Sequence, residues 1–350
     1  MSSKEYQFDY LVFIGRFQPL HSGHLAVFKQ ALDIAENVIV VVGSANQPRT
    51  PKDPWTYGER YEMILQSLKA EGLFDADRVH FTCIRDQIYN DQNWAASVQE
   101  VVTSAKRGWH DIDRIGIIGH NKDESSYYLK MFPQWKLVEH ENLDILNATD
   151  IRRLYFEGFN SRYLKAAVPE PVFKYLEWFK VNKPEYKMLV REFDFINKYK
   201  KGWEVAPYPV TIMTGDALVV QSGHLLLVQR RSSPGEGLCA LPGGHIDPNE
   251  TVEECAIREL REETKLKVPA PVLRGSIKAS KLFDSPKRSL KGRVITTAYL
   301  IELPPGPLPA VKGSSDAKKA RWVPINEIRS DEMFEDHFDI IRYFNIGNKN

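Results

Sequence analysis

The sequence predicts an α/β protein of two domains, in which a doubly wound parallel sheet comes first and an α+β domain with a mixed sheet follows. Three observations lead to this prediction. Short apolar runs alternate with helical stretches as far as Val138. The pattern changes after the proline-rich segment 206–210, where strands alternate with Gly/Pro turns. The length of 350 residues is typical of about two domains.

The first domain begins with a βαβ unit. Two β-branched runs, YLVFIG at 10–15 and NVIVVVG at 37–43, flank the helical stretch LAVFKQALDIAE. Further strands are expected at 79–84, 114–118 and 135–138, with helices at 57–69, 94–106 and 124–132. Strands that alternate with helices form a parallel sheet covered on both faces, which is a Rossmann-like architecture.

The end of the first domain is predicted from a change in the sequence pattern, from alternating strands and helices to charged helices. Residues 163–199 read as charged, amphipathic helices that close this domain and lead into a linker. The strands ALVV, HLLLVQRR and VITTAYLIEL then alternate with turns around one acidic helix near 251–265. We therefore expect domains at 1–190 and 200–345, with the boundary at about 190–205.

Charge, cysteine content and hydropathy indicate which binding partners and which cellular compartment to expect. The formal net charge of +1 gives no general attraction to nucleic acid or membrane, so neither is expected as a partner. Cys83, Cys239 and Cys255 lie far apart and in no metal-binding spacing, which fits a reducing cytoplasm. The first residues lack the apolar core of a signal peptide, and no apolar run reaches the roughly 18 residues of a membrane span. The oligomeric state, including a homo-oligomer, stays open.

The first predicted strand runs directly into GRFQPLHSGH at 15–24. Ligands bind at such strand ends in open α/β sheets, and Gly15 would let the backbone approach one closely. His21 and His24 are three residues apart at a helix start, where free N–H groups attract phosphate. Two imidazoles there would donate hydrogen bonds to a phosphate whose charge grows during transfer.

The turn at 15–24 has two other interpretations. The histidines would be incidental polar residues, or they would bind a metal as His-x-x-His, although no cysteine or third histidine lies nearby in the sequence. A G-x-x-x-x-G-K-[ST] motif is absent from the sequence, which excludes a P-loop enzyme. No G-x-G-x-x-G follows a strand, which disfavours a dinucleotide redox fold.

GRFQPLHSGH resembles the G-x-x-x-P-x-H-x-G-H signature of the adenylyltransferase superfamily. The wider segment 8–170 resembles archaeal-type nicotinamide mononucleotide adenylyltransferases, with supporting pieces at 41–60, 90–94, 117–135 and 147–158. The closing Ser-x-Ser/Thr-x-x-Arg motif has Asn147 in place of its first serine, while Thr149 and Arg152 remain. The resemblance implies that ATP and nicotinamide mononucleotide are joined to give NAD and pyrophosphate.

The same resemblance implies roles for individual residues. His21, His24 and Arg152 would be catalytic, and Trp94 would stack on the nicotinamide ring unless it is a core aromatic. The ATP phosphates would be held by Arg16, His21, His24, Lys52 and Arg152, and Gly15, Phe17 and Thr149 would complete the nucleotide site. Arg60 is expected to form only a surface ion pair with Glu59 or Glu62.

The second domain carries a spaced acidic motif in GGHIDPNETVEECAIRELREETKL at 243–266. Five residues separate Gly244 from Glu250, and Glu259, Glu262 and Glu263 share one side of the predicted helix. Like charges so placed repel, and a divalent cation such as Mg²⁺ or Mn²⁺ reverses that penalty. The alternative, a solvated helix rich in Glu and Arg, does not account for the Gly-Gly turn and the offset of Glu250.

This spacing resembles the Nudix box, a loop–helix–loop that hydrolyses nucleoside diphosphates linked to another group. The resemblance implies Gly244 at the substrate, catalysis by Glu259, Glu262 and Glu263, and metal binding by Glu250, Glu259, Glu262 and Glu263. Arg258 would brace Glu262 or the glycine loop. Lys265 stands where the family usually has glycine, so it must adopt the left-handed backbone that ends the helix or the helix ends differently.

Segments 272–304 and 310–328 resemble the Nudix half of bifunctional adenylyltransferase/ADP-ribose pyrophosphatases. The implied reaction cleaves ADP-ribose to AMP and ribose 5-phosphate. Arg293 or Arg288 would grip a phosphate, Phe283 would stack on adenine, and Asp316 would lie in the loop that often supplies a general base; for the first three the alternative is a surface loop.

Other activities remain open on the sequence alone. The front domain would adenylylate or cytidylylate another phosphate ester, or the back domain would cut NADH or a diadenosine polyphosphate. A back domain that senses ADP-ribose or NAD without cutting is disfavoured by the complete carboxylate set and by the lack of a basic recognition helix.

Overall fold

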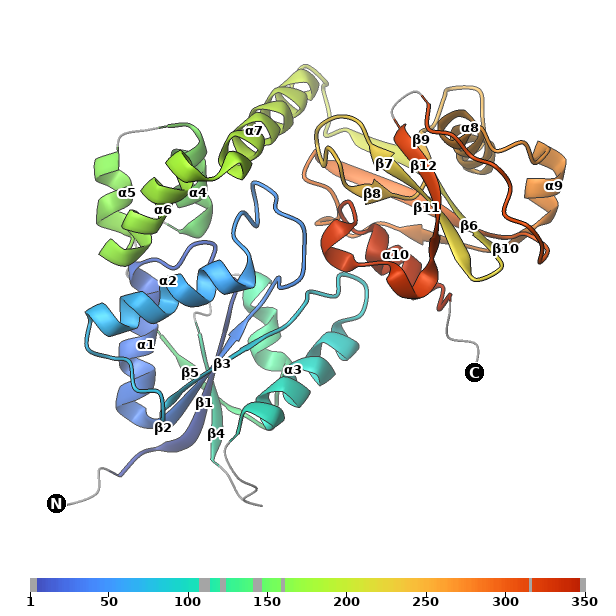
Figure 1. Ribbon diagram of the computed structural model, residues 1–350. Coiled ribbons are helices and arrows are strands. Elements are labelled where there is room, and N and C mark those ends of the chain that lie inside the picture. Colours follow the sequence, from blue (N-terminus) through green and yellow to red (C-terminus); the bar gives the residue numbers. More distant parts are fainter. Residues whose placement is uncertain are drawn as a thin grey trace. The chain divides into compact units, whose positions relative to one another are not determined.

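The computed structural model describes residues 5–106, 114–119, 124–140, 147–158, 161–314 and 317–346 of the chain (Figure 1). The chain divides into two compact units, Met1–Val190 and Arg191–Asn350. Within the described ranges, no helix combines the length and the apolar character that crossing a membrane requires.

The N-terminal unit is built on a five-stranded sheet in the order β3-β2-β1-β4-β5. All neighbouring strands pair in parallel, which confirms the predicted sheet. The strands are β1 (Phe8–Gly15), β2 (Ala35–Val42), β3 (Val79–Cys83), β4 (Ile115–Gly119) and β5 (Lys136–Glu139). The strand order reverses between β1 and β4, so a ligand crevice is expected beyond the carboxyl ends of these strands.

Helices cover both faces of this sheet. Figure 1 shows α1 (Ser22–Ile34) and α2 (Tyr57–Ala70) on one side and α3 (Asp91–Ala105) on the other. Residues 38–42 of β2 are fully buried, because a strand covered on both faces has no solvent side. The unit continues with η1 (Glu124–Met131), α4 (Ala148–Phe156), α5 (Ser161–Ala167) and α6 (Glu170–Asn182).

The C-terminal unit contains a mixed sheet in the order β10-β11-β6-β7-β12. β11 runs parallel to β6, and the other pairs recorded in this sheet are antiparallel. The strands are β6 (Thr211–Gln221), β7 (His224–Arg230), β10 (Ile277–Phe283), β11 (Arg293–Glu302) and β12 (Ala317–Pro324), with β8 (Cys239–Ala240) beside β7 and β9 (Gly243–His245) beside β6. The short elements are α9 (Ala270–Gly275), η2 (Ile325–Glu327), η3 (Ser330–Glu332) and α10 (His337–Tyr343).

α8 (Val252–Thr264) is the acidic helix predicted from the sequence. Thr251 caps its N-terminus by accepting a hydrogen bond from the Glu254 N–H. The buried side chains of Ile257 and Leu260 anchor the helix in the apolar core of the unit. Lys265 ends it in the left-handed conformation, at φ 51° and ψ 26°, as expected for a residue that replaces glycine.

α7 (Pro184–Trp203) crosses the division between the two units, and its second half belongs to the C-terminal one. Glu192 attaches it there, because the buried carboxylate accepts a hydrogen bond from the Gly235 N–H at 3.2 Å. Gly235 has φ 75°, and a Cβ at this position would collide with the Phe334 ring. Burial, and then the charge of Glu335, raise the pKa of Glu192 to about 7, although the Gly235 bond and Arg230 oppose the shift.

The Glu192→Gln variant is expected to be more stable than the wild type at neutral pH, because glutamine cannot ionise in this buried position. The folded-state pKa lies above the ordinary value of 4.5, so the stabilising contribution of the protonated carboxyl is complete below pH 4.5 and is lost as pH rises through about 7. Across that pH range, the free energy of unfolding of the wild type should fall by about 3 kcal/mol relative to that of Glu192→Gln, because each pKa unit corresponds to about 1.36 kcal/mol. Urea unfolding at a series of pH values measures this difference, and parallel pH profiles would contradict the assignment.

Candidate active sites

The loop that follows β1 packs on the buried aromatic ring of Phe17. Phe17 has φ 51° and is 1% exposed, and its ring lies 5.2 Å from that of Phe13 and 4.9 Å from that of His24, between centroids. A Cβ on Gly15 would come within 2.8 Å of the Phe17 ring, so this position requires glycine. The ring is part of the core, so the predicted contact of Phe17 with the nucleotide falls to its backbone and stays a prediction.

The two histidines lie together where α1 begins. Their ring centroids are 3.8 Å apart, and the His21 N–H donates to Nδ1 of His24 at 3.3 Å. His21 is 4% exposed and occupies the N-cap position, whereas His24 is half-buried. The imidazoles therefore share one side of the helix start, near the free N–H groups that favour an anion.

Arg152 lies beneath the same loop. Its Nη1 donates to the Gln18 carbonyl oxygen at 2.6 Å, and its Nη2 donates to the Thr149 hydroxyl at 3.1 Å. The side chain is buried, and burial, helped by the Arg16 charge and opposed by Asp53, lowers the pKa of Arg152 to about 10. This guanidinium is still cationic at neutral pH and forms no ion pair with a carboxylate of the described residues, so it suits a phosphate.

The altered closing motif has a structural explanation. Asn147 is the N-cap of α4, where its Oδ1 accepts hydrogen bonds from the Thr149 N–H at 2.9 Å and the Asp150 N–H at 3.1 Å. Asparagine is among the best residues at this position. Asn147 thereby orients the first turn of α4, which carries Thr149 toward Arg152.

Arg16 and Lys52 are accessible cations near this loop. The Arg16 side chain is 45% exposed, and its Nη1 lies 3.7 Å from Oδ1 of Asp53, next to the half-buried Lys52. Trp94 on α3 is also half-buried, with its ring centroid 6.2 Å from that of Tyr128. The ring therefore joins the core without being covered, and its stacking on nicotinamide stays a prediction.

Arg60 is a residue of this site that sequence reasoning missed. It is fully buried, so the prediction of a surface ion pair is wrong. The guanidinium donates to the carbonyl oxygens of Arg16 and Gly43 at 2.6 Å each and of Ser44 at 3.0 Å. It thereby holds the carboxyl ends of β1 and β2 together. The burial of Arg60 could have been predicted from the sequence, because Arg60 precedes the apolar Met63 and Ile64 by three and four positions and so shares their face of α2.

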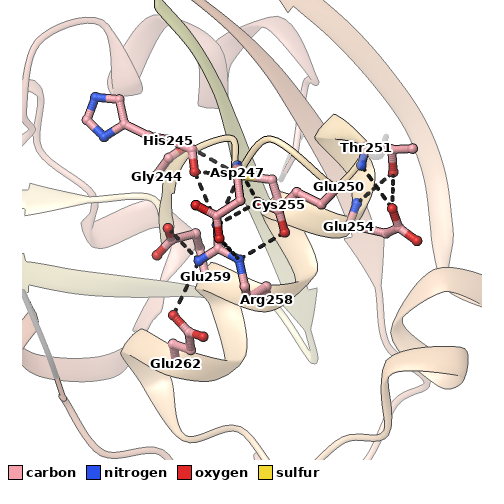
Figure 2. Close-up of polar contacts among 10 residues, drawn as sticks. All are labelled: Gly244, His245, Asp247, Glu250, Thr251, Glu254, Cys255, Arg258, Glu259 and Glu262. Atoms are coloured by element: carbon pink, nitrogen blue, oxygen red, sulfur yellow. Dashed lines mark hydrogen bonds and ion pairs between the residues drawn. The ribbon is translucent and has the colours of Figure 1, made fainter.

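Arg258 organises the acidic motif of the C-terminal unit (Figure 2). Its Nε and Nη2 bind the two oxygens of Glu250 at 2.9 and 2.7 Å, and Nη2 also donates to the His245 carbonyl oxygen at 3.1 Å. Nη1 reaches Glu259 at 2.9 Å and Glu262 at 3.3 Å. The expected brace to Glu262 and to the glycine loop is present, and the pair with Glu250 is bidentate.

Glu250 is fully engaged by this arrangement. Arg258 holds the pKa of Glu250 near 2, with a further contribution from the Asp247 N–H, which donates to Oε1 at 2.9 Å. Both carboxylate oxygens are therefore occupied. This geometry contradicts the prediction that Glu250 is a metal ligand and gives it the role of fixing Arg258.

The other carboxylates are less well compensated. Burial raises the pKa of Glu259 in spite of Arg258, and it raises that of Glu263 to about 8 in spite of the Gly243 N–H, which donates to Oε2 at 3.1 Å. A Cβ on Gly244 would collide with the carboxylate of Glu259, so the glycine lets the loop lie against that group. A cation at this position would favour the ionised form of both carboxylates.

These donors fit Mg²⁺ or Mn²⁺ in type, since both ions prefer carboxylate oxygens. The carboxylates do not form a ready metal site in this structure. Among the described residues, no three His, Cys, Asp or Glu side chains converge to hold a metal ion. Arg258 instead binds Glu259 and Glu262. Glu259 and Glu262 would hold a cation only in place of their ion pairs with Arg258, and Glu250 would remain the partner of Arg258.

Further substrate contacts predicted for this unit are partly wrong. Phe283 is 1% exposed, with its ring centroid 5.4 Å from that of Tyr343, so it does not offer a face to adenine. Arg288 is buried in an ion pair with Asp336 at 2.9 Å, so it does not grip a phosphate. Arg293 is half-buried and donates to the Asp284 carbonyl, and its phosphate role stays a prediction. Asp316 lies outside the described residues.

Comparisons with known proteins match each unit separately. Residues 12–154 match the cytidylyltransferase-like family, and residues 213–344 match the NUDIX domain family. The nicotinamide/nicotinic acid mononucleotide adenylyltransferase of Acinetobacter baylyi is 42% identical over 189 residues, which cover 54% of this chain and 95% of the relative. The ADP-ribose pyrophosphatase of Methanocaldococcus jannaschii is 33% identical over 127 residues, which cover 36% of this chain and 69% of the relative.

Two solved structures match nearly the whole chain. The bifunctional NMN adenylyltransferase/ADP ribose pyrophosphatase of Francisella tularensis is 34% identical, with a TM-score of 0.90, over 97% of this chain and 98% of that one. A second structure of that protein, complexed with AMP and a Mn ion, matches with a TM-score of 0.89.

Proposed function

Because this chain belongs to the family of bifunctional nicotinamide mononucleotide adenylyltransferases and ADP-ribose pyrophosphatases, we propose that each unit catalyses one reaction. The N-terminal unit joins ATP and nicotinamide mononucleotide to give NAD and pyrophosphate. The C-terminal unit cleaves ADP-ribose to AMP and ribose 5-phosphate. The observation that carries this proposal is a similarity that extends over 97% of the chain and so includes both candidate sites.

In the N-terminal unit, a phosphate oxygen of the mononucleotide attacks the α-phosphorus of ATP in line, and pyrophosphate leaves. Such a reaction needs positioning and charge stabilisation rather than a protein nucleophile. Arg152, His21 and His24 would contact the phosphates where negative charge develops, and Arg16 and Lys52 would hold the outer phosphates. Arg60 is a positioning residue, because it fixes the backbone of the strand end that carries Arg16.

In the C-terminal unit, Glu259, Glu262 and Glu263 would hold a divalent cation, which when bound neutralises diphosphate charge and activates water. Mg²⁺ and Mn²⁺ both suit these ligands, and the Mn ion in the Francisella tularensis structure supports a divalent metal. Glu250 binds Arg258 at 2.7 Å and would hold it beside the cluster if the other carboxylates bound the cation. The lack of a side chain at Gly244 lets the loop lie against Glu259, so a diphosphate at that carboxylate would be next to the loop backbone.

We also propose that the chain works in the cytoplasm on small nucleotides. Cys83, Cys239 and Cys255 are all free thiols, which a reducing compartment preserves.

A substrate panel on the whole protein tests the proposed function. With Mg²⁺, ATP and nicotinamide mononucleotide should give NAD and pyrophosphate, and ADP-ribose should give AMP and ribose 5-phosphate, as read by chromatography. NADH and a diadenosine polyphosphate serve as comparison substrates for the C-terminal unit. Faster cleavage of either one than of ADP-ribose would contradict the assigned substrate, and failure to form NAD would contradict the first reaction.

A further inference from the structure

The buried imidazole of His337, the first residue of α10, binds the chain just ahead of the acidic motif. It is 7% exposed, and its Nδ1 accepts a hydrogen bond from the buried Leu241 N–H at 2.9 Å. Because a backbone N–H can only donate, Nδ1 carries no proton and the imidazole is neutral. Burial lowers the pKa of His337 in spite of the charges of Asp216 and Asp336, which favours this neutral form.

The start of α10 is itself held in place by the loop between β10 and β11. Nε and Nη2 of Arg288 bind the two carboxylate oxygens of the buried Asp336 at 2.9 and 3.0 Å. The neighbouring Glu335 accepts hydrogen bonds from the Ser289 hydroxyl at 2.8 Å and from the Leu290 N–H at 3.2 Å. A bidentate buried pair next to the imidazole leaves it little freedom to move.

A second hydrogen bond joins the same two segments of the chain. The Phe334 N–H donates to the Cys239 carbonyl oxygen at 2.8 Å, and Cys239 also forms an isolated parallel bridge with Met333. Residues 333–337 therefore run beside residues 239–241 and hold them through the backbone and through the imidazole.

The chain that follows Leu241 lies against two carboxylates of the acidic motif. The Gly243 N–H donates to Oε2 of Glu263 at 3.1 Å, and the Pro242 carbonyl oxygen accepts from the Ala217 N–H of β6 at 2.9 Å. One residue later, the loop packs so closely on Glu259 that a Cβ would collide with its carboxylate. A shift of the backbone two residues earlier would therefore disturb both carboxylates.

We propose that His337 is a positioning residue for ADP-ribose cleavage, which holds the Gly243–Gly244 loop against Glu259 and Glu263 by accepting the Leu241 N–H. The inference rests on the proposed pyrophosphatase activity and adds a residue that acts on it without touching the substrate. Without the acceptor, the buried N–H has no partner, which costs free energy that the loop recovers by moving. A displacement of about 1 Å at a catalytic group is enough to lower a rate by about 100-fold.

His337→Phe keeps a flat ring but removes the acceptor, so kcat for ADP-ribose should fall roughly 10- to 100-fold while NAD synthesis is unchanged. His337→Asn should recover most of the rate, because the amide oxygen takes the place of Nδ1. Ile340→Val is the matched control, since this buried residue of α10 contributes packing alone and its loss of a methyl group should lower the melting temperature but not kcat.

Three kinetic outcomes would overturn the proposal, with rates measured well below the melting temperature of each variant. They are a wild-type kcat in His337→Phe, a kcat in His337→Asn as low as in His337→Phe, and an equal loss of kcat in Ile340→Val. The last of these would show that the rate follows the stability of α10 rather than the hydrogen bond.

Hydrogen exchange in the metal-free protein tests the contact apart from catalysis. The Leu241 amide of the wild type should exchange as slowly as the amides of the neighbouring strands, and His337→Phe should speed its exchange roughly tenfold or more. Fast exchange of this amide in the wild type would overturn the proposal even if His337→Phe does not fold. A wild type that fails to cleave ADP-ribose would contradict the proposed function, and the exchange rates would still decide whether His337 holds the loop.

Discussion

Replacing Glu263 with Gln is expected to lower the rate of ADP-ribose cleavage by about 100- to 1000-fold, while NAD synthesis continues at the wild-type rate. Glu263 is 9% exposed and its pKa is raised to about 8 by burial, so without a cation it is mostly protonated at neutral pH. Gln resembles that neutral form, and its oxygen still accepts from the Gly243 N–H. The substitution therefore preserves the loop and removes the charge that a divalent cation requires.

The matched control for this variant is Glu253→Gln on the same helix. The Glu253 side chain is 37% exposed and pairs with Arg274 at 2.7 Å, away from Arg258. Initial rates at saturating Mg²⁺ should equal those of the wild type for this control. If Glu263→Gln cleaves ADP-ribose within a few-fold of the wild-type rate, the carboxylate cluster is not the catalytic centre. Unchanged circular dichroism for both variants excludes misfolding as the cause of a lost rate.

Arg152→Ala is expected to reduce NAD synthesis by about 100- to 1000-fold and to leave ADP-ribose cleavage unchanged. Arg152 is a buried cation held to the Gln18 carbonyl and the Thr149 hydroxyl, in the loop that we propose binds the phosphates. Arg152→Lys should recover only part of the rate, because a lysine supplies the charge but not the two parallel donors. Measurement of initial rates at saturating ATP and mononucleotide gives the comparison.

Arg153→Ala provides the neighbouring control. Arg153 is 52% exposed and forms ion pairs with Asp150 and Glu157 on the surface of α4. Exposed pairs contribute little to stability, so this variant should synthesise NAD at the wild-type rate. Equal losses in Arg152→Ala and Arg153→Ala would indicate that α4 matters only as a whole, and the phosphate role of Arg152 would then be wrong.

The strands and the principal helices were predictable because their signals are local. Residues 38–42 form an unbroken apolar run because the strand is covered on both faces. The motif around Lys265 left two alternatives, a left-handed residue or a different end of the helix, and the structure has the first. Both features depend on neighbours in the sequence.

The roles that failed depend on partners far along the chain. Arg60 binds carbonyl groups 16, 17 and 44 positions away, and nothing near it in the sequence specifies them. Phe283 is covered by Tyr343, and Arg288 is neutralised by Asp336 48 positions later. Glu250 was predicted to bind a metal because the spacing of the motif shows the carboxylates but not their partners. In the structure its partner is the Arg258 guanidinium.

The central claim is that one chain holds two independent active sites, and a single crossed assay tests it most directly. Wild type, Glu263→Gln and Arg152→Ala each receive ATP, nicotinamide mononucleotide, ADP-ribose and Mg²⁺, and the products are separated by chromatography. The wild type should form NAD and ribose 5-phosphate, Glu263→Gln should form only NAD, and Arg152→Ala should form only ribose 5-phosphate. Loss of both products in either variant, or retention of both, would contradict the claim.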